Sequence, residues 1–463
     1  MPDTYDVIVL GAGPTGENVA DRAVKGGLTA AIAESELAGG ECSYWACMPS
    51  KALLRPVAVN DEARHVEGVS GARLDPPAVL ARRDSFASNW KDDRQVAWLT
   101  EAHVDLFRGL GRITGARSVK IGEKELKARQ AVVVCTGSRA VIPPVPGIAG
   151  ARPWTSREVT SSHRVPGRLA IIGGGVVACE MAAAWQALGT QVTLLARGRL
   201  LDRMEEFAGD LVAQGLSGAG VDVRRGVQAT AAERDGADGV EGTVRLLLDD
   251  GSALEADEVL VATGRAPRTD EIGLETVGLA PGSWLDVDDT CQVRGIDGGW
   301  LYAAGDVNHL ALLTHMGKYQ GRVCGDAIAA RAGGKQPAVT AWANHSCVPQ
   351  VVFTVPEVAA VGLSAAQAQA AGYHVRVVDY DIGAVAGARL FADGYAGQAR
   401  MVVDEDRRVI VGATLAGPGV GEMIHAATIA VAGQVPLDLL WHAVPSYPTV
   451  SEVWLRLLER YGL

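Results

Sequence analysis

A glycine-rich turn near the N-terminus constrains the fold of this 463-residue chain more than any other feature. The apolar run YDVIVL, residues 5–10, is typical of a buried strand, and GAGPTG follows it with Gly11, Gly13 and Gly16. A helical stretch comes next, and a second apolar run, LTAAIAE, ends on Glu34. Glycines in this pattern allow a tight turn and let the backbone approach a pyrophosphate, which the helix N-terminus then faces. The segment therefore predicts a dinucleotide-binding unit in which Glu34 accepts hydrogen bonds from ribose hydroxyls.

The same pattern returns in the middle of the chain. The strand LAII leads into GGGVVACE, and the strand QVTLLA follows; the turn residues are Gly173, Gly175 and Ala178. No acid ends this second strand, because Ala196 stands there and Arg197 and Arg199 come next. An acid repels a 2′-phosphate, whereas guanidinium groups bind one through paired hydrogen bonds.

The two units therefore predict different dinucleotides. The first unit fits an adenosine without a 2′-phosphate and hence FAD, and the second fits NADPH, with NADH less favoured. A single glycine turn is often only a turn, and Arg197 and Arg199 would also suit a solvated surface. Two copies in the same strand–turn–helix–strand context favour nucleotide binding over that alternative.

Two more glycine junctions add candidate cofactor-binding residues. Gly137, in VVVCTGSRAV, and the strand VLVATG would lead into and out of the second unit. WLYAAGDV is a strand that ends on Gly305 and Asp306. The aspartate can accept a hydrogen bond from a polyol hydroxyl, or it can cap a helix.

The sequence pattern of the chain changes after about residue 340. Alternating runs such as HVRVVDYDI and ARMVVDEDRRVIVGATLAG predict antiparallel strands and an α+β domain. We expect an α/β protein with two Rossmann-like dinucleotide-binding domains and a C-terminal α+β domain. The expected boundaries are 1–150 and 269–340 for the two parts of the FAD-binding domain, 151–268 for the NAD(P)-binding domain and 341–463 for the C-terminal domain.

Charge and hydropathy argue against two classes of partner. The net charge is −11 and no long basic run occurs, which disfavours nucleic acid because phosphate neutralisation needs clustered Lys and Arg. No apolar stretch of about 18 residues is present, so we expect no membrane span. The N-terminal apolar run is short and has no basic leader, so we expect no signal peptide and a cytoplasmic location.

Two of the seven cysteines, Cys42 and Cys47, lie close together in GGECSYWACMPSK. Residues five apart on a regular helix rise about 7.5 Å, too far for a disulfide, so the pair can bond only if the chain bends between them. Pro49 suits the start of a helix, which would place Cys47 at the positive end and favour its thiolate. Two buried thiols and a metal site are the alternatives. Structural zinc needs four ligands and no second Cys or His pair lies nearby, so we expect no metal.

The whole chain resembles the pyridine nucleotide–disulfide oxidoreductases, the class that includes glutathione reductase, dihydrolipoamide dehydrogenase and mercuric reductase. Five motifs in the family's order carry the resemblance: GAGPTG, GGECSYWACMPSK, GGGVVACE, YAAGDV and FTVPEVAAVGLS. The resemblance implies a flavoenzyme that forms a homodimer through a C-terminal dimerisation domain. It also implies that Cys47 lies against the flavin, that Cys42 meets the substrate, and that Lys51 and Glu180 form an ion pair near the flavin.

The resemblance breaks near the C-terminus. The family usually has HPTxSE there, in which the His of the partner subunit is an acid–base group and the Glu orients it. This chain reads YPTVSE, so Tyr447 stands in the His position while Glu452 keeps the acid. A phenol, whose ordinary pKa is about 10, is a poor base at neutral pH but can donate a hydrogen bond. His442 and His315 are other candidates for the base, although both are also typical of surface positions.

The resemblance implies that electrons pass from NADPH through FAD to a Cys42–Cys47 disulfide and on to a small-molecule acceptor. Without the histidine we expect an acceptor that needs little proton help: a disulfide with an acidic leaving thiol, a quinone or a metal ion. The alternatives are a dihydrolipoamide dehydrogenase-like dithiol oxidase that runs in reverse, and a slow flavin redox sensor. Tyr44 and Trp45, between the cysteines, offer a flat acceptor a stacking face or pack under a neighbouring loop.

Overall fold

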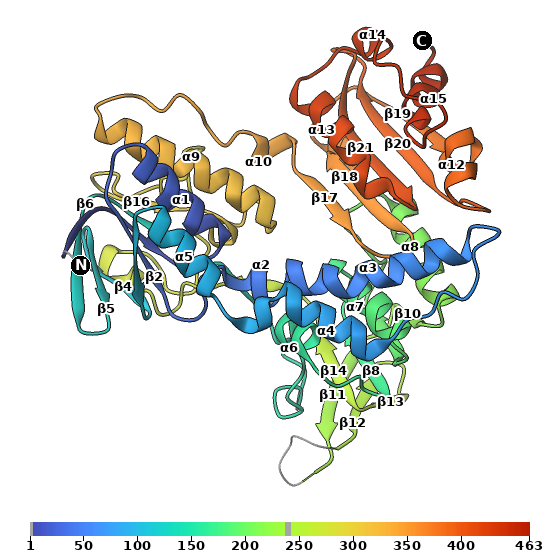
Figure 1. The fold of residues 1–463 in the computed structure, drawn as a ribbon, viewed down its shortest axis with the longest axis horizontal. Coiled ribbons are helices and arrows are strands. Elements are labelled where there is room, and N and C mark those ends of the chain that lie inside the picture. Colours follow the sequence, from blue (N-terminus) through green and yellow to red (C-terminus); the bar gives the residue numbers. More distant parts are fainter. Residues whose placement is uncertain (1–2, 237–241) are drawn as a thin grey trace. The chain divides into compact units, whose positions relative to one another are not determined.

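The computed structural model describes residues 3–236 and 242–463 as two compact units, each assembled from segments that are far apart in the sequence (Figure 1). Unit 1 is drawn from Met1–Pro49, Asp84–Ala140 and Gly264–His345, and unit 2 from Ser50–Arg83, Val141–Thr263 and Ser346–Leu463. Both units mix helices with sheets. The expected α/β class is confirmed.

Unit 1 is built on a seven-stranded sheet. Its parallel part runs in the order β3 (Val104–Arg108), β2 (Ala30–Glu34), β1 (Thr4–Leu10) and β6 (Lys124–Val134), and β16 (Leu301–Ala303) also pairs with β6. An antiparallel edge follows with β5 (Ser118–Ile121) and β4 (Gly111–Gly115). The nearly continuous apolar run of β1 is typical of a parallel strand that is covered on both faces.

Two helices of unit 1, α1 (Pro14–Lys25) and α9 (Thr314–Ala332), pack side by side (Figure 1). The helix α2 (Gly40–Tyr44) also belongs to this unit. A small antiparallel pair, β7 (Ser138–Ala140) with β15 (Arg265–Pro267), completes the part of unit 1 that positions the site.

Unit 2 contains a four-stranded parallel sheet with the order β10 (Asp222–Arg225), β9 (Gln191–Ala196), β8 (Arg168–Ile172) and β14 (Glu258–Val261). The helices α7 (Val176–Ala187) and α8 (Glu206–Gly218) follow β8 and β9 along the chain. A separate antiparallel sheet consists of β11 (Ala229–Arg234), β12 (Val244–Leu248) and β13 (Ala253–Ala256). The strand, turn, helix and strand predicted for the second dinucleotide unit are therefore present.

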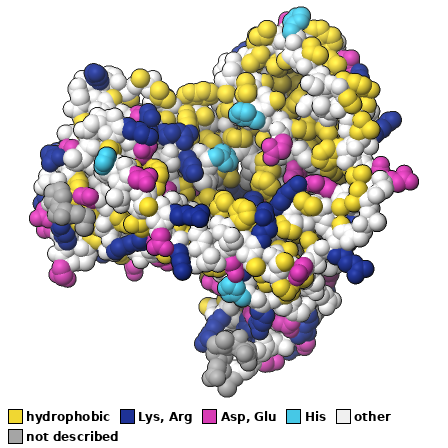
Figure 2. Space-filling model, viewed as in Figure 1, with side chains coloured by type: hydrophobic (Ala, Val, Ile, Leu, Met, Phe, Trp, Pro, Cys, Tyr) yellow, Lys and Arg dark blue, Asp and Glu magenta, His cyan; other side chains and the backbone are white. Residues whose placement is uncertain are grey.

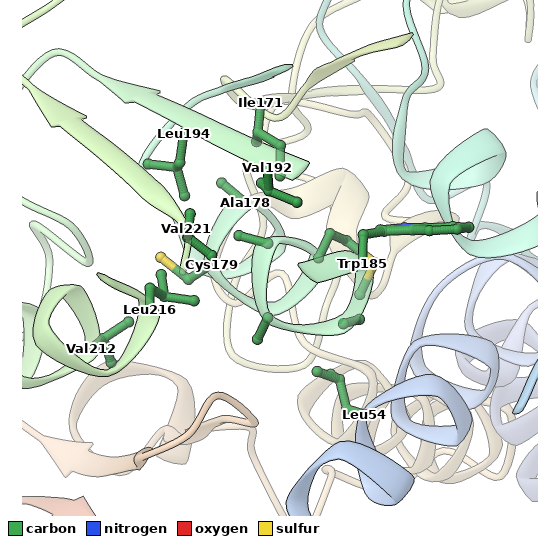
Figure 3. Packing of buried hydrophobic residues seen from close by; sticks show 14 of the residues in the cluster. Leu54, Ile171, Ala178, Cys179, Trp185, Val192, Leu194, Val212, Leu216 and Val221 are labelled. Atoms are coloured by element: carbon green, nitrogen blue, oxygen red, sulfur yellow. The ribbon is translucent and has the colours of Figure 1, made fainter. Parts of the chain in front are cut away.

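The core of unit 2 surrounds α7. Figure 3 shows Ala178, Cys179 and Trp185 beside side chains of the sheet, of α8 and of Leu54. Trp185 is fully buried, and its indole N–H donates to the Val159 carbonyl at 3.2 Å. The small alanine side chains of α7 let the helix lie close to the sheet, and the one large ring fills the space that remains.

The C-terminal part of unit 2 is a five-stranded antiparallel sheet. Its order is β17 (Pro349–Val352), β18 (Glu357–Gly362), β21 (Val409–Gly417), β20 (Gln398–Asp404) and β19 (Val375–Asp381). The helix α13 (Ile424–Ala432) contacts β18 and β21, and α15 (Glu452–Tyr461) contacts β19 and β20. This arrangement confirms the α+β texture predicted after residue 340.

Further helices are α3 (Cys47–Arg64), α4 (Pro76–Phe86), α5 (Asp93–Glu101), α6 (Ser156–Ser161), α10 (Ala343–Ser346), α11 (Ala365–Ala370), α12 (Ala386–Phe391) and α14 (Leu437–Leu440). None of the helices in residues 3–236 and 242–463 combines the length and the apolar character that crossing a bilayer requires.

Candidate active site

The first glycine turn leaves no room for side chains at two of its positions. Gly11 has φ +101°, and a Cβ there would lie 2.5 Å from the Cys135 carbonyl oxygen. A Cβ at Gly16 would lie 2.0 Å from the Gly11 carbonyl oxygen. Gly13 is the N-cap of α1 and makes no side-chain cap, and a Cβ added there would lie 4.0 Å from the Gly40 Cα. The turn is therefore tight inside, while the N-terminal N–H groups of α1 stay open to an anion.

Glu34, at the end of β2, holds this turn in place. Its Oε2 accepts a hydrogen bond from the Ala12 N–H and its Oε1 accepts one from the Glu36 N–H, both at 2.8 Å. Burial raises the pKa of the Glu34 carboxyl, and these two backbone hydrogen bonds lower it. The carboxylate thus has a structural part in addition to the ribose contact predicted for it, and its remaining lone pairs are those that a ribose can use.

The second glycine turn repeats this construction in unit 2. Gly173 has φ +133°, and a Cβ there would lie 2.3 Å from the Ala262 carbonyl oxygen. Gly175 is the N-cap of α7 and has open space where its Cβ would stand. Ala178 takes the third position and is buried in α7.

The positive charge expected beside this second turn comes from two neighbouring strands. Arg197 follows β9 and is exposed, whereas the Arg199 guanidinium donates to the Asp202 carbonyl at 3.3 Å. On the next strand, β10, Arg225 lies opposite Ala196 in the register and pairs with Asp210 at 2.9 Å. Arg225 was not predicted from the sequence, because no local signal pairs residue 225 with residue 196.

Gly137, Gly305 and Asp306 come together in unit 1. Gly137 has φ +74° and precedes β7, and its carbonyl accepts a hydrogen bond from the Arg268 N–H at 3.0 Å. Gly305 has φ +82°, and a Cβ there would lie 2.7 Å from Thr15 Oγ1, on α1. The Asp306 carboxylate accepts a hydrogen bond from the Ser138 hydroxyl. The motif at Gly305 and Asp306 therefore lies against the first glycine turn, as a single binding site for one cofactor requires.

The chain bends between Cys42 and Cys47, as the disulfide hypothesis requires. The helix α2 ends at Tyr44, Trp45 has φ −135°, and α3 begins at Cys47. Cys47 Sγ lies 3.1 Å from the hydroxyl oxygen of Thr314, the first residue of α9. Both cysteines are in the thiol form. The pKa of the Cys42 thiol is raised, first by its hydrogen bond with Cys47 and then by burial, while Thr314 opposes this shift.

The two aromatic residues between the cysteines differ in their surroundings. Tyr44 is buried, its hydroxyl donates to the Ala38 carbonyl at 2.8 Å, and its own carbonyl accepts from the Trp90 indole at 3.1 Å. Tyr44 therefore packs inside unit 1, which rules out a stacking face for a substrate on this ring. Trp45 is half-buried, with its ring centroid 5.7 Å from that of Tyr44.

Lys51 and Glu180 form the ion pair that the family resemblance implies, within unit 2. Lys51 Nζ donates to Glu180 Oε2 at 2.7 Å, and the Phe353 N–H donates to Oε1 at 3.0 Å. Glu180 is 3% exposed and Lys51 is 36% exposed. The Lys51 ammonium also lies 4.9 Å from the centroid of the Phe353 ring. Both oxygens of the Glu180 carboxylate thus accept a hydrogen bond, and the carboxylate fixes the position of the Lys51 ammonium, which extends from α3.

Two of the C-terminal candidates lie on the loop between α14 and α15, and the third, Glu452, begins α15. Tyr447 is 76% exposed, and His442 is exposed as well. Glu452 is buried and pairs with Arg456, one turn later in α15. His315, by contrast, lies in unit 1 on α9, one residue after Thr314, and is exposed. Glu452 therefore has a different partner from the one expected by analogy with the family.

Thr314 is a site residue that the sequence analysis did not name. It stands 267 positions from Cys47, so no motif joins the two residues. In the described part of the chain, no cluster of three or more His, Cys, Asp or Glu side chains is arranged to hold a metal ion.

These features fit FAD at the first turn and a nicotinamide dinucleotide at the second. Each glycine turn leaves a helix N-terminus open beside a position that only glycine can occupy, and the first is bordered by Glu34 and Asp306. FAD would be held by the turn at Gly11–Gly16 together with Gly305 and Asp306, and a nicotinamide dinucleotide by the turn at Gly173–Gly175.

The chain matches two family descriptions. Residues 5–333 match "Pyridine nucleotide-disulphide oxidoreductase", and residues 348–457 match "Pyridine nucleotide-disulphide oxidoreductase, dimerisation domain". Dihydrolipoyl dehydrogenase 3 from Pseudomonas aeruginosa is 34% identical over 98% of this chain and 97% of its own length. Glutathione reductase from Burkholderia cepacia is 31% identical over 98% of this chain and 99% of its own length.

Among solved structures, the HOCl-induced flavoprotein disulfide reductase RclA from Escherichia coli is similar in fold. Its TM-score is 0.83 at 23% identity, over 98% of this chain and 99% of that one. The full-length identity above 30% to known enzymes and the two family matches decide the assignment. The chain is an enzyme of the FAD-dependent pyridine nucleotide-disulphide oxidoreductase family.

Proposed function

We propose that this enzyme passes electrons from NADPH through FAD to the Cys42–Cys47 pair and on to a small oxidised acceptor. The observation that carries the proposal is the bend between α2 and α3, which brings the two thiols within hydrogen-bonding reach of each other beside Thr314. FAD, when bound, supplies a ring that accepts electrons from a nicotinamide and gives them to sulfur.

The two cysteines divide the work on a disulfide acceptor. The Cys42 thiolate attacks one acceptor sulfur, the acceptor S–S bond breaks, and the leaving thiolate takes up a proton. Cys47 then attacks Cys42, closes the Cys42–Cys47 bond and releases the second acceptor thiol. NADPH supplies the two electrons that return the pair to thiols. Thr314 supports this chemistry because a hydroxyl at 3.1 Å can donate a hydrogen bond to a thiolate at Cys47.

The preference for NADPH rests on the residues beside the second turn. Ala196 removes the acid that would repel a 2′-phosphate, and the exposed Arg197 can reach one. Arg225 lies opposite Ala196, but its charge is paired with Asp210, so we assign it a smaller part. Arg199 is tied to its own loop through the Asp202 carbonyl, and we assign it the smaller part.

A homodimer is part of the proposal. The dimerisation-domain match covers residues 348–457, and Figure 2 shows hydrophobic side chains gathered over the C-terminal sheet and helices of unit 2. Ile429, Leu439 and Val444 are exposed apolar residues there. Contiguous exposed apolar surface of this kind is typical of an interface between protein chains. A cytoplasmic location stays a prediction.

Dithiol oxidation in the reverse direction is a second candidate. The similarity to dihydrolipoyl dehydrogenases over 98% of the chain favours it. The exposed Tyr447 in the position of the family's histidine disfavours it, because oxidation of a dithiol requires a base to take up its protons.

One panel of assays separates these functions. The FAD-loaded enzyme is given NADPH with disulfides of rising thiol acidity, with quinones and with metal ions, and separately NAD⁺ or NADP⁺ with dihydrolipoamide. Steady NADPH consumption with at least one acceptor, fastest for the most acidic leaving thiol among disulfides, supports the proposal. Fast dihydrolipoamide oxidation with no NADPH-driven turnover would replace it by the second candidate, and a single reduction that then stalls would indicate a sensor.

A further inference from the structure

Helix α9 approaches α1 closely because glycines replace side chains at their contact. A Cβ at Gly317 would lie 2.4 Å from Thr15 Oγ1, and one at Gly321 would lie 2.6 Å from the Thr15 carbonyl oxygen. The two helices lie side by side in unit 1 (Figure 1). This close approach brings the residue after Gly317, Lys318, to the first turn of α1.

Lys318 also extends from the face of α9 that carries Thr314, the residue that contacts Cys47. It follows Thr314 by four residues in α9, so both side chains lie on one face of the helix, about 6 Å apart along its axis. The Thr314 hydroxyl is the group at 3.1 Å from Cys47 Sγ. The Lys318 charge acts on the Cys42 thiol, where it lowers a pKa that the Cys47 hydrogen bond and burial raise.

Glu17, in the first turn of α1, is the other group that the Lys318 charge reaches. Its side chain is 8% exposed, and its Oε1 is buried with no hydrogen-bond partner within residues 3–236 and 242–463. Burial raises the pKa of the Glu17 carboxyl to about 7; Lys318 lowers it, and Glu34 raises it further. The carboxyl can therefore change its charge near neutral pH.

The titratable and charged groups around Glu17 come from three other elements of unit 1. Glu34 comes from β2 and Lys318 from α9. The Tyr44 phenol comes from α2, and Tyr44 in turn faces Asp92, Arg108 and Asp93. Of these, Lys318 is the cation that acts on both Glu17 and Cys42.

We propose that Glu17 and Lys318 are positioning residues that control the thiolate of Cys42, in the place of the family's missing histidine. An ionised Glu17 neutralises Lys318, whereas a protonated Glu17 leaves the full Lys318 charge to stabilise the thiolate. When Cys42 loses its S–H proton and Glu17 gains an O–H proton, the summed charge of Cys42, Glu17 and Lys318 stays unchanged. The inference rests on the proposed function, in which Cys42 meets the acceptor.

The test measures the thiolate directly and does not depend on turnover. The FAD-loaded protein is reduced, and the rate of Cys42 alkylation by iodoacetamide is followed by peptide mass spectrometry between pH 5 and 9. Lys318→Met should slow alkylation about tenfold at pH 7, because an opposite charge is removed from a partly buried thiolate. Lys318→Arg, which keeps the charge, should restore the rate, and Arg322→Met, one turn further along α9, is the matched control and should leave it unchanged.

Glu17→Gln should change the Cys42 alkylation rate in the opposite direction. It should match the wild-type rate below pH 6 and exceed it above pH 7, where the wild-type carboxylate neutralises Lys318. The alkylation rate of wild-type Cys42 should therefore rise less steeply with pH around 7. In Glu17→Gln the rate should rise without this shallower region. The double variant should behave like Lys318→Met, because Glu17 acts through the lysine.

Two results would overturn the inference. One is a Lys318→Met rate within twofold of the wild type, and the other is a Glu17→Gln rate that falls together with that of Lys318→Met. If NADPH fails to reduce the pair, the proposed function is wrong, but alkylation after chemical reduction still decides the role of Lys318. If Glu17→Gln does not retain FAD, the Lys318→Met, Lys318→Arg and Arg322→Met rates alone decide it.

Discussion

Replacing Glu180 with leucine should destabilise unit 2 by an amount that the structure lets us estimate. The carboxylate accepts one hydrogen bond from Lys51 and one from the Phe353 N–H, and it is 3% exposed. Leucine leaves the Phe353 N–H without an acceptor, which costs about 1–3 kcal/mol. Lys51 is 36% exposed and can turn its ammonium to water, so the lost ion pair adds only about 1 kcal/mol. The expected loss is therefore about 2–4 kcal/mol.

The assay is thermal unfolding of the FAD-loaded protein, followed by circular dichroism. At roughly 2 °C per kcal/mol for a large domain, Glu180→Leu should lower the midpoint by about 4–8 °C. Glu180→Gln is the matched control, because its amide oxygen still accepts from the Phe353 N–H and only the ion pair is lost. The control should lower the midpoint by about 2 °C. Equal losses for the two variants would refute the reasoning, since the unpaired N–H is what separates them.

Three further variants test the cofactor and acid–base assignments. The double variant Arg197→Ala/Arg199→Ala should raise the KM for NADPH about tenfold or more and leave the KM for NADH nearly unchanged; equal effects on both, or the same effect from Arg203→Ala, would remove the 2′-phosphate argument. Gly16→Ala should abolish FAD retention, measured as flavin absorbance per protein, because its Cβ would lie 2.0 Å from the Gly11 carbonyl oxygen; retention of the flavin would show that the turn can relax. Tyr447→His should raise kcat for a disulfide acceptor by about 100-fold if the absent base limits the rate; an unchanged kcat would point to another proton donor.

Local features of the fold followed from the sequence. Each glycine turn is a property of a short segment, in which Gly11 and Gly173 need positive φ and an open helix N-terminus follows. The bend between Cys42 and Cys47 was a condition of the disulfide hypothesis, because five residues of regular helix cannot bring two sulfurs together, and the structure meets that condition. Steric rules over a few residues decide these features.

Contacts between distant segments did not follow from the sequence. Thr314 reaches Cys47 across 267 positions, and the Ser138 hydroxyl meets Asp306 across 168. Arg225 joins the edge near Ala196 only through the register of β10 on β9. Such contacts depend on how strands pair and how helices cross, which the packing of the whole unit determines. The same reason applies to Glu17 and Lys318, which no motif connects.

The central claim is that electrons from NADPH arrive at Cys42 and Cys47, and differential alkylation tests it most directly. The FAD-loaded protein is first oxidised so that the Cys42–Cys47 disulfide is closed. It is then denatured in N-ethylmaleimide before and after one anaerobic addition of NADPH, and each cysteine peptide is quantified. The account predicts that Cys42 and Cys47 are unlabelled before NADPH and fully labelled after it, while Cys135, Cys179, Cys291, Cys324 and Cys347 are labelled equally in both samples. Unchanged labelling of Cys42 and Cys47 would contradict it.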